Sequence, residues 1–381
     1  MKRPRIFVIG PVPPPIHGQS IAVEQIINSG LSRNYEFILF NKSTLSAKIG
    51  DQGRFRVIKI LRYSEFILKL YLDLIQNPPS ICYISLAQSR LGIIRDSIIM
   101  SICAKFSHVV IHLHGGAFRI QFDRLNIVEK WFVRFALKRV SKAIILSECF
   151  GPIFDELVLP SKIRIIRNGL PDFYEGVYPD GRSQGSNIHI LFLSNLEPEK
   201  GLWDVLASLG RLKSRNVPFT ATIAGPFPNT KIRDQTLSII TDLGLEKYIE
   251  LPGIVTGQVK ASLFARADVF VFLPSQIEGQ PLVIIEALMA GLPIVATDQG
   301  SISEMVVDQG NGFVVPVHDI ESVVEKITLL SKYPHIRKEM GQKSRQRFVD
   351  EYTEEQYLAK MKMVFDDVLT APRKQLEISD R

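Results

Sequence analysis

Short apolar segments alternate with segments of helical period along most of the chain. The apolar segments of the first half are candidate β-strands: Ile6–Gly10, Glu36–Phe40, Ile81–Ser85, Val109–His112, Ala143–Ser147 and Ile163–Arg167. Segments of helical period lie between them, for example Val57–Gln76 and Leu125–Val140. Parallel strands that helices cover on both faces read as nearly continuous apolar runs, because neither face meets water. The alternation predicts an α/β domain with a doubly wound parallel sheet.

The pattern stops at residues 171–187, where proline, glycine and polar side chains dominate, and we expect a linker there. It resumes with candidate strands at Ile188–Leu193, Phe219–Ala224, Tyr248–Leu251, Val269–Leu273 and Ile294–Ala296, and two helical segments follow at about 333–349 and 353–369. A length of 381 residues also favours two domains. We therefore expect two domains, at 1–175 and 186–350. Open α/β sheets bind ligands at the carboxyl ends of their strands, so two such domains that face each other would form a ligand-binding cleft.

The composition is that of a globular chain. Apolar residues make up 46% and charged residues 22%, a balance that argues against disorder, collagen and small disulfide scaffolds. Three cysteines in a chain of this length indicate a reducing compartment. The apolar run Ile6–Ile9 is too short for a signal peptide, and no stretch reaches the roughly 20 apolar residues of a membrane span. We therefore expect a cytoplasmic protein.

Positive charge gathers in the first half. Residues 1–180 contain 24 basic and 14 acidic side chains, a net charge of +10, whereas the whole chain carries +7. Residues 54–72 combine basic side chains with a broad apolar face. A second predicted helix has a basic residue every four positions: Lys130, Arg134, Lys138 and Lys142. Such helices can rest on an anionic membrane, although a core helix with a solvated basic face gives the same pattern. No nucleic-acid-binding motif stands out, so nucleic acid is not an expected partner.

The most informative segment is Pro274–Ala296, which follows a candidate strand and opens a candidate helix. Pro281 suits the first helical position, where its missing N–H costs nothing. Free backbone N–H groups at a helix start, together with the helix dipole, favour a phosphate. Glu278 lies in the loop within reach of a sugar, and Glu286 lies in the second turn, where its carboxylate can accept hydrogen bonds from a ribose diol. The N–H groups expected at the phosphate belong to Gly279, Gln280 and Leu282.

This segment resembles the signature of the group 1 (family 4) retaining glycosyltransferases, whose GT-B fold has two Rossmann-like domains. The shared pattern is E-x7-E followed by A-x-x-A-G-x-P-I-V-A-T. It falls on Glu278, Glu286, Ala287, Ala290, Gly291, Pro293, Ile294, Val295, Ala296 and Thr297. The resemblance implies that the first domain binds an acceptor, that the second binds a nucleotide-sugar donor, and that a C-terminal helix at about 353–381 packs back on the first. A buried helix with two solvated carboxylates is the plain alternative.

The segment Leu191–Gly201 resembles the same family. Members place an arginine and a lysine here, both on the donor diphosphate, and Lys200 occupies the lysine position. Asn195 stands where many members have the arginine, and an amide lacks both the charge and the bidentate fork of a guanidinium. The resemblance implies donor contacts from Lys200, Asn195 and Glu286, with Glu278 orienting the sugar. Taken without its neighbours, Lys200 would be a solvated lysine ahead of a helix.

The loop Gly10–Ser20 follows the first candidate strand and resembles a loop that lies over the donor phosphates and beside the acceptor in the family. Many members have two glycines where this chain has His17 and Gly18. Gly18 allows a close approach of the backbone, and Ser20 could cap the next helix. A proline-rich surface loop is the alternative interpretation.

The sequence HLHGG at 112–116 ends another candidate strand. Family members often have a histidine here that faces the transferred sugar, and His114 fits that place, with Gly115 beside it as an acceptor-side candidate. We expect His112 to point the other way because side chains alternate along a strand. A structural histidine is the alternative. No third ligand at metal spacing lies nearby, so no metal site is expected.

Together these matches predict a retaining, metal-independent glycosyltransferase without a cofactor. It would move a sugar from a nucleotide diphosphate sugar to a hydroxyl of a glycan or lipid-linked acceptor, in bacterial surface polysaccharide or glycolipid synthesis. Glu278, His114 and Lys200 are the expected catalytic residues. Two alternatives stay open: a nucleotide-sugar epimerase of the same fold, and a non-catalytic nucleotide-sugar-binding component of a polysaccharide assembly. The base, the sugar and the linkage have no signature in the sequence.

Overall fold

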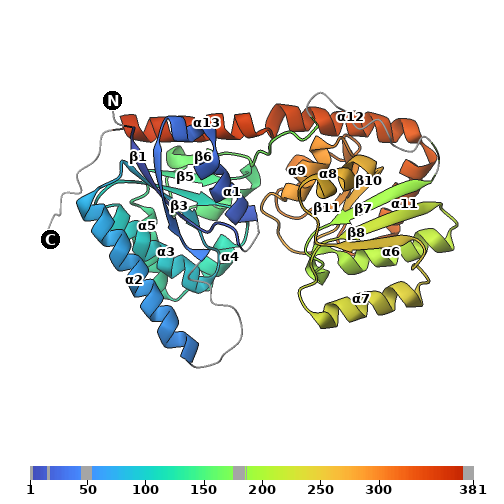
Figure 1. The fold of residues 1–381 in the computed structure, drawn as a ribbon, viewed down its shortest axis with the longest axis horizontal. Coiled ribbons are helices and arrows are strands. Elements are labelled where there is room, and N and C mark those ends of the chain that lie inside the picture. Colours follow the sequence, from blue (N-terminus) through green and yellow to red (C-terminus); the bar gives the residue numbers. More distant parts are fainter. Residues whose placement is uncertain (1–2, 15–17, 44–53, 175–184, 186, 372–381) are drawn as a thin grey trace. The chain divides into compact units, whose positions relative to one another are not determined.

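The fold is described from a computed structural model. It covers residues 3–14, 18–43, 54–174, 185 and 187–371, with the backbone alone for 54–61. The chain divides into two compact units (Figure 1). Unit 1 contains residues 1–167 and 357–381, and unit 2 contains residues 168–356. The last described helix thus belongs mainly to the same unit as the first strand.

Unit 1 is built on a six-stranded parallel sheet with the strand order β2-β1-β3-β4-β5-β6. Its strands are β1 (Arg5–Gly10), β2 (Glu36–Asn41), β3 (Ile81–Leu86), β4 (His108–Leu113), β5 (Lys142–Ile145) and β6 (Ile163–Ile165). Its helices are α1 (Gly18–Asn28), α2 (Arg54–Gln76), α3 (Arg90–Cys103), α4 (Phe118–Asp123), α5 (Ile127–Leu137) and α13 (Glu354–Thr370). Short 3₁₀ helices lie at Gly30–Arg33, Glu148–Phe154 and Pro160–Lys162.

Helices cover both faces of this sheet, so the alternating side chains of one strand enter two different cores. Phe7 of β1 packs into the core that α2, α3 and α5 cover. Its neighbour Val8 packs into the opposite core, with α1 and with Phe365 of α13. The Tyr35 hydroxyl donates a hydrogen bond to Asp366 Oδ1 at 2.6 Å. Residues near both ends of the sequence therefore complete the same core.

Unit 2 repeats the architecture with a second six-stranded parallel sheet, in the order β12-β11-β10-β7-β8-β9. Its strands are β7 (Ile188–Leu193), β8 (Phe219–Ala224), β9 (Ile249–Gly253), β10 (Val269–Phe272), β11 (Ile294–Thr297) and β12 (Gly312–Val315). Its helices are α6 (Leu202–Ser214), α7 (Thr230–Asp242), α8 (Gly257–Arg266), α9 (Leu282–Met289), α10 (Ile302–Met305), α11 (Ile320–Lys332) and α12 (Pro334–Glu351), with a 3₁₀ turn η5 (Pro198–Lys200) before α6.

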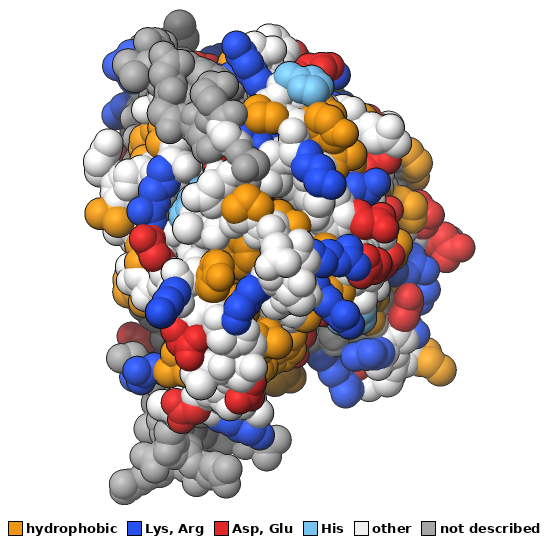
Figure 2. All heavy atoms as spheres, turned by 90° about the vertical axis from the view of Figure 1, so that its right-hand side faces the viewer, with side chains coloured by type: hydrophobic (Ala, Val, Ile, Leu, Met, Phe, Trp, Pro, Cys, Tyr) orange, Lys and Arg blue, Asp and Glu red, His pale blue; other side chains and the backbone are white. Residues whose placement is uncertain are grey.

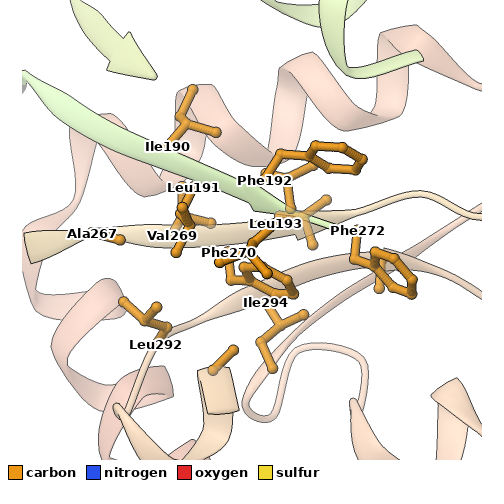
Figure 3. Packing of buried hydrophobic residues seen from close by; sticks show 14 of the residues in the cluster. Ile190, Leu191, Phe192, Leu193, Ala267, Val269, Phe270, Phe272, Leu292 and Ile294 are labelled. Atoms are coloured by element: carbon orange, nitrogen blue, oxygen red, sulfur yellow. The ribbon is translucent and has the colours of Figure 1, made fainter. Parts of the chain in front are cut away.

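The core of unit 2 is formed around the central strands. Figure 3 shows side chains of β7 and β10, among them Phe192, Phe270 and Phe272, packed in one cluster with Ile294 of β11. The rings of Phe270 and Phe272 lie nearly parallel, with centroids 6.3 Å apart. These residues are fully buried, which explains why their strands read as unbroken apolar runs in the sequence. This packing fixes the positions of the strand ends, from which the loops described below extend.

The predicted fold class is confirmed, since both units are parallel-sheet α/β structures. Two details differ. The short edge strand β12 was not predicted. The helix expected over Leu125–Val140 ends at Leu137, so Lys142 does not extend the basic stripe of that helix. Lys142 is instead the first residue of β5, and its Nζ forms an ion pair with Asp367 Oδ2 at 2.7 Å. The predicted helix at 54–72 is present as part of α2.

Charged side chains of both signs lie next to one another on the face drawn in Figure 2. Among the described helices, none is both long enough and apolar enough to cross a membrane.

Candidate active site

Loops from neighbouring strands of unit 2 meet at the carboxyl edge of its sheet. The N–H of Ser275, after β10, donates to the carbonyl of Glu199, after β7, at 3.0 Å. The Thr297 hydroxyl, at the end of β11, donates to the carbonyl of Pro274 at 2.6 Å. These two hydrogen bonds tie three loops into one framework. Parallel α/β sheets place their ligand sites at this edge.

Two glycines with positive φ let these loops approach each other closely. Gly201 has φ +90°, and a Cβ there would lie 2.2 Å from the carbonyl oxygen of Leu273. Gly300 has φ +67°, and a Cβ there would lie 2.0 Å from the carbonyl oxygen of Glu278. Ser301, the next residue, donates its hydroxyl to the carbonyl of Gly279. The backbone around Glu278 is thus fixed by a turn that only glycine can form.

Lys200 and Glu278 form an ion pair at this edge, with Lys200 Nζ 2.5 Å from Glu278 Oε1. Lys200 ends η5, and Glu278 lies in the loop before α9. Both side chains are mostly buried. The two catalytic residues predicted in the second half of the chain are therefore in direct contact, although 77 residues separate them in the sequence.

The start of α9 lies four residues after Glu278. The helix begins at Leu282 with Pro281 as its N-cap, so the prediction that Pro281 takes the first helical position is wrong by one residue. The buried side chain of Gln280 accepts a hydrogen bond from the Asn168 N–H at 2.5 Å, which anchors the loop to the start of unit 2. The N–H of Ile284 donates to the carbonyl of Pro281 at 3.0 Å. The N–H groups that precede it at a helix start have no carbonyl partner within an α-helix. They leave the end of α9 with a partial positive charge.

Glu286 in the second turn of α9 forms an ion pair with Lys260 of α8. Burial raises the pKa of Glu286, while the nearby Lys260 ammonium acts in the opposite direction. Within the part of the chain that the structure describes, the second oxygen, Oε2, is buried and has no hydrogen-bond partner. A buried carboxylate oxygen without a partner is costly. It fits a ligand that brings a hydroxyl donor.

The sequence analysis missed Lys260. The helical segment that contains it has no motif, and its partner Glu286 lies on another helix. Asn195 is exposed in the loop after β7, and its carbonyl accepts a hydrogen bond from the Glu197 N–H at 2.8 Å. The cation that contacts Glu278 at this edge is thus Lys200.

The remaining predicted residues belong to unit 1. Gly18 is the first residue of α1, and a Cβ there would meet no atom of the described residues within 4 Å. Ser20 is buried within the first turn and does not cap the helix, contrary to expectation. His17 lies outside the described residues. Gly115 packs against Gln88, whose side-chain oxygen accepts a hydrogen bond from the Ala117 N–H at 2.7 Å.

His112 and His114 lie on the same side of the chain, so the prediction that they point in opposite directions is wrong. Their ring centroids are 3.9 Å apart. Residues i and i+2 of a strand share a face, and alternation separates only direct neighbours. His112 is fully buried, and its Nδ1 lies 2.7 Å from the Tyr83 hydroxyl. Burial and the adjacent His114 hold the pKa of His112 well below its usual value.

Comparisons with known proteins agree with this description. Residues 179–347 match the family model of the glycosyl transferases group 1. The chain is 28% identical to a putative colanic acid biosynthesis glycosyltransferase, WcaL, of Salmonella typhimurium. The similarity extends over 183 residues, which are 46% of this chain and 44% of that protein. The chain is 25% identical to a GDP-mannose:cellobiosyl-diphosphopolyprenol alpha-mannosyltransferase of Xanthomonas oryzae, over 70% of each chain.

Solved structures share the whole architecture. HepE of Anabaena, crystallised with UDP and glucose, has a TM-score of 0.72 at 15% identity, over 96% of this chain and 100% of that one. A sucrose-phosphate synthase of Thermosynechococcus elongatus has a TM-score of 0.75 at 15% identity, over 97% and 100%. The two parallel-sheet units are those of the GT-B fold. In unit 2 the chain is similar to the group 1 glycosyltransferases.

Proposed function

We propose that this chain is a retaining glycosyltransferase. It moves a sugar from a nucleoside diphosphate sugar to a hydroxyl group of a glycan or lipid-linked acceptor, in the synthesis of a bacterial surface polysaccharide or glycolipid. The observation that carries the proposal is the Lys200–Glu278 ion pair beside the start of α9. The names of the relatives support the class of product, because they refer to colanic acid and to a polyprenol-linked sugar.

The diphosphate of the donor binds between Lys200 and the first N–H groups of α9. An ammonium group has three N–H donors, so Lys200 can contact a phosphate oxygen and Glu278 at the same time. The helix end adds positive partial charge where the leaving diphosphate gains negative charge. UDP in the HepE structure supports a nucleoside diphosphate as the ligand of this fold.

The two glutamates then have different tasks. Glu278, next to the diphosphate, accepts a hydrogen bond from the donor sugar and orients its anomeric carbon. Glu286, which carries the buried oxygen without a partner, accepts hydrogen bonds from the ribose hydroxyls. His114, in unit 1, remains a predicted contact of the transferred sugar.

In the reaction, the bond between the anomeric carbon and the phosphate oxygen breaks. The acceptor oxygen forms a bond to the same carbon on the same face, and its proton passes to the departing phosphate. Lys200 stabilises the charge that develops on that phosphate. We propose that this cation and the helix end supply the positive charge that a divalent metal supplies elsewhere, and transfer that stops in EDTA would contradict this part.

A thermal-shift panel of UDP, GDP and ADP with their glycosyl forms tests the donor site, because a ligand of the folded state raises the melting temperature. The nucleoside diphosphate sugar that raises the melting temperature is then used as the donor with a panel of glycan and lipid-linked acceptors. Lys200→Ala should weaken diphosphate binding by at least about tenfold, the loss of one charge-assisted contact. Lys343→Ala is the matched control, because it removes an exposed lysine that pairs with Glu339 at 2.7 Å in the same unit.

Three outcomes distinguish the alternatives. Transfer of the sugar with retained anomeric configuration supports the proposal. Conversion of the nucleotide-sugar without any acceptor would instead indicate an epimerase. Donor binding with no turnover over the whole panel would indicate a non-catalytic nucleotide-sugar-binding component.

A further inference from the structure

Four large apolar side chains are exposed where α3 and α5 begin. The exposed fractions are 79% for Leu91, 86% for Ile127, 74% for Val128 and 64% for Trp131. Single exposed apolar residues are common on soluble proteins, but four at one place mark an interaction surface. We call these four residues the apolar tip.

An ion pair links the two parts of the tip. Arg90, next to Leu91, binds both carboxylate oxygens of Glu129 at 2.9 and 3.0 Å. Glu129 lies in the first turn of α5 and also closes a capping box with Asn126. The first turn that carries Ile127 and Val128 is therefore held in helical form by two sets of hydrogen bonds. Its apolar side chains stay exposed because of the fold and not because a helix end frays.

Basic side chains lie before and along α5, the helix that carries most of the tip. Arg124, just before α5, is exposed, and so are Arg134 and Lys138 further along that helix, while Lys130 is half-buried. Of the acidic side chains here, Glu129 pairs with Arg90 and Asp123 pairs with Arg119. The local surface thus combines an apolar centre with a positive rim. The net charge of residues 1–180 is also positive.

We propose that the apolar tip inserts into the interfacial layer of a bilayer that contains anionic lipid, and that the basic rim binds the lipid headgroups. Tryptophan prefers the interfacial layer because its ring has an apolar body and a polar N–H. Lysine and arginine near an anionic leaflet are attracted to it. A bilayer satisfies both features at once. The inference concerns unit 1 alone and does not depend on glycosyl transfer.

Trp131 provides the direct test, because the sequence has two tryptophans. In a Trp203→Phe background, Trp131 is the sole reporter. Vesicles of phosphatidylcholine mixed with phosphatidylglycerol should shift its emission to the blue, and brominated lipid should quench it. Binding to phosphatidylcholine alone should be much weaker. Absence of the shift, or equal binding to both vesicle types, would overturn the proposal.

Two double variants locate the contact. Ile127→Ser with Val128→Ser should lower the vesicle partition coefficient by at least about tenfold, since two aliphatic side chains no longer leave water. Leu72→Ser with Ile75→Ser is the control, because it removes two exposed aliphatic side chains from α2, at 45% and 51% exposure. Unchanged melting temperatures will show that both variants fold. If the α2 variant lost binding and the tip variant kept it, the proposed surface would be wrong.

Discussion

Lys260 should decide how well the site binds a ribose. Lys260→Met keeps most of the volume of the side chain but removes the cation that pairs with Glu286. An ionised carboxylate left buried without its partner would cost about 3–5 kcal/mol. Because this cost exceeds that of taking up a proton, Glu286 should become neutral near pH 7 in the variant. A neutral carboxyl group is a weaker acceptor for the ribose hydroxyls.

The expected loss follows from the strength of these hydrogen bonds. A hydrogen bond to a charged group contributes about 1.5–3 kcal/mol, against about 0.5–1.5 kcal/mol for one between neutral groups. The difference of roughly 1.4 kcal/mol corresponds to about tenfold weaker binding of the nucleoside diphosphate at pH 7. The loss should be specific to the ribose hydroxyls, so it should be smaller for the 2′-deoxynucleotide, which lacks one of the two hydroxyl donors.

The pH dependence has a defined sign. Burial raises the pKa of Glu286 above its ordinary value, and Lys260 opposes that rise. Affinity for the ribose form should therefore fall in the wild type as the pH drops through the raised pKa. In Lys260→Met the fall should begin at a higher pH, because the opposing cation is gone.

Isothermal titration calorimetry with the ribo- and deoxyribonucleotides over a pH series measures both effects. Lys260→Arg should keep the wild-type profile, since it keeps the charge. If Lys260→Met retained the full preference for the 2′-hydroxyl at every pH, Glu286 would not be the ribose acceptor that the ion pair indicates.

Three further predictions concern other parts of the molecule. Glu278→Ala should fold normally but lower the transfer rate by at least about a hundredfold, on the scale of one lost transition-state contact, and unchanged turnover by purified enzyme would remove Glu278 from the site. Gly300→Ala should lower the melting temperature and weaken donor binding, whereas Gly253→Ala, which also has positive φ but meets nothing within 4 Å, should pay only the backbone strain; equal effects in both would show that the contact at Gly300 does not matter. Phe365→Ala in α13 should cost about 3–5 kcal/mol of unfolding free energy in denaturant titration, and a loss below about 1 kcal/mol would mean that α13 adds little to the core of unit 1.

The sheets could be predicted from the sequence because buried parallel strands are apolar on both faces. The predicted bounds of β7 and β8 agree with the structure at both ends. The edge strand β12 (Gly312–Val315) was missed, since four residues that begin with glycine give little periodic signal. The prediction that Lys142 belongs to the basic stripe is also wrong. A spacing of four residues has meaning only inside a helix, and α5 ends before that residue.

Residues of the candidate site could be predicted from the sequence where they lie in a motif. A residue that reaches the site only through tertiary packing could not. Glu278 and Lys200 were found in two separate segments, and the structure brings them into contact. The pair of Glu286 with Lys260 was invisible, because it joins two helices through tertiary packing. The predicted orientation of His112 is wrong, because alternation along a strand separates neighbouring residues and not residues two apart. His112 and His114 therefore share a face, as the structure shows.

The division of unit 1 into two stretches of sequence affects how the protein is made. Val8 and Phe365 share one core, but the ribosome synthesises all of unit 2 between them. Unit 2 is continuous in sequence and can therefore fold while translation is still in progress. One side of the first sheet must wait for the last helix to leave the exit tunnel. Until then, we expect Ile6, Val8 and Tyr83 of that core to lack the cover that α13 provides in the folded protein.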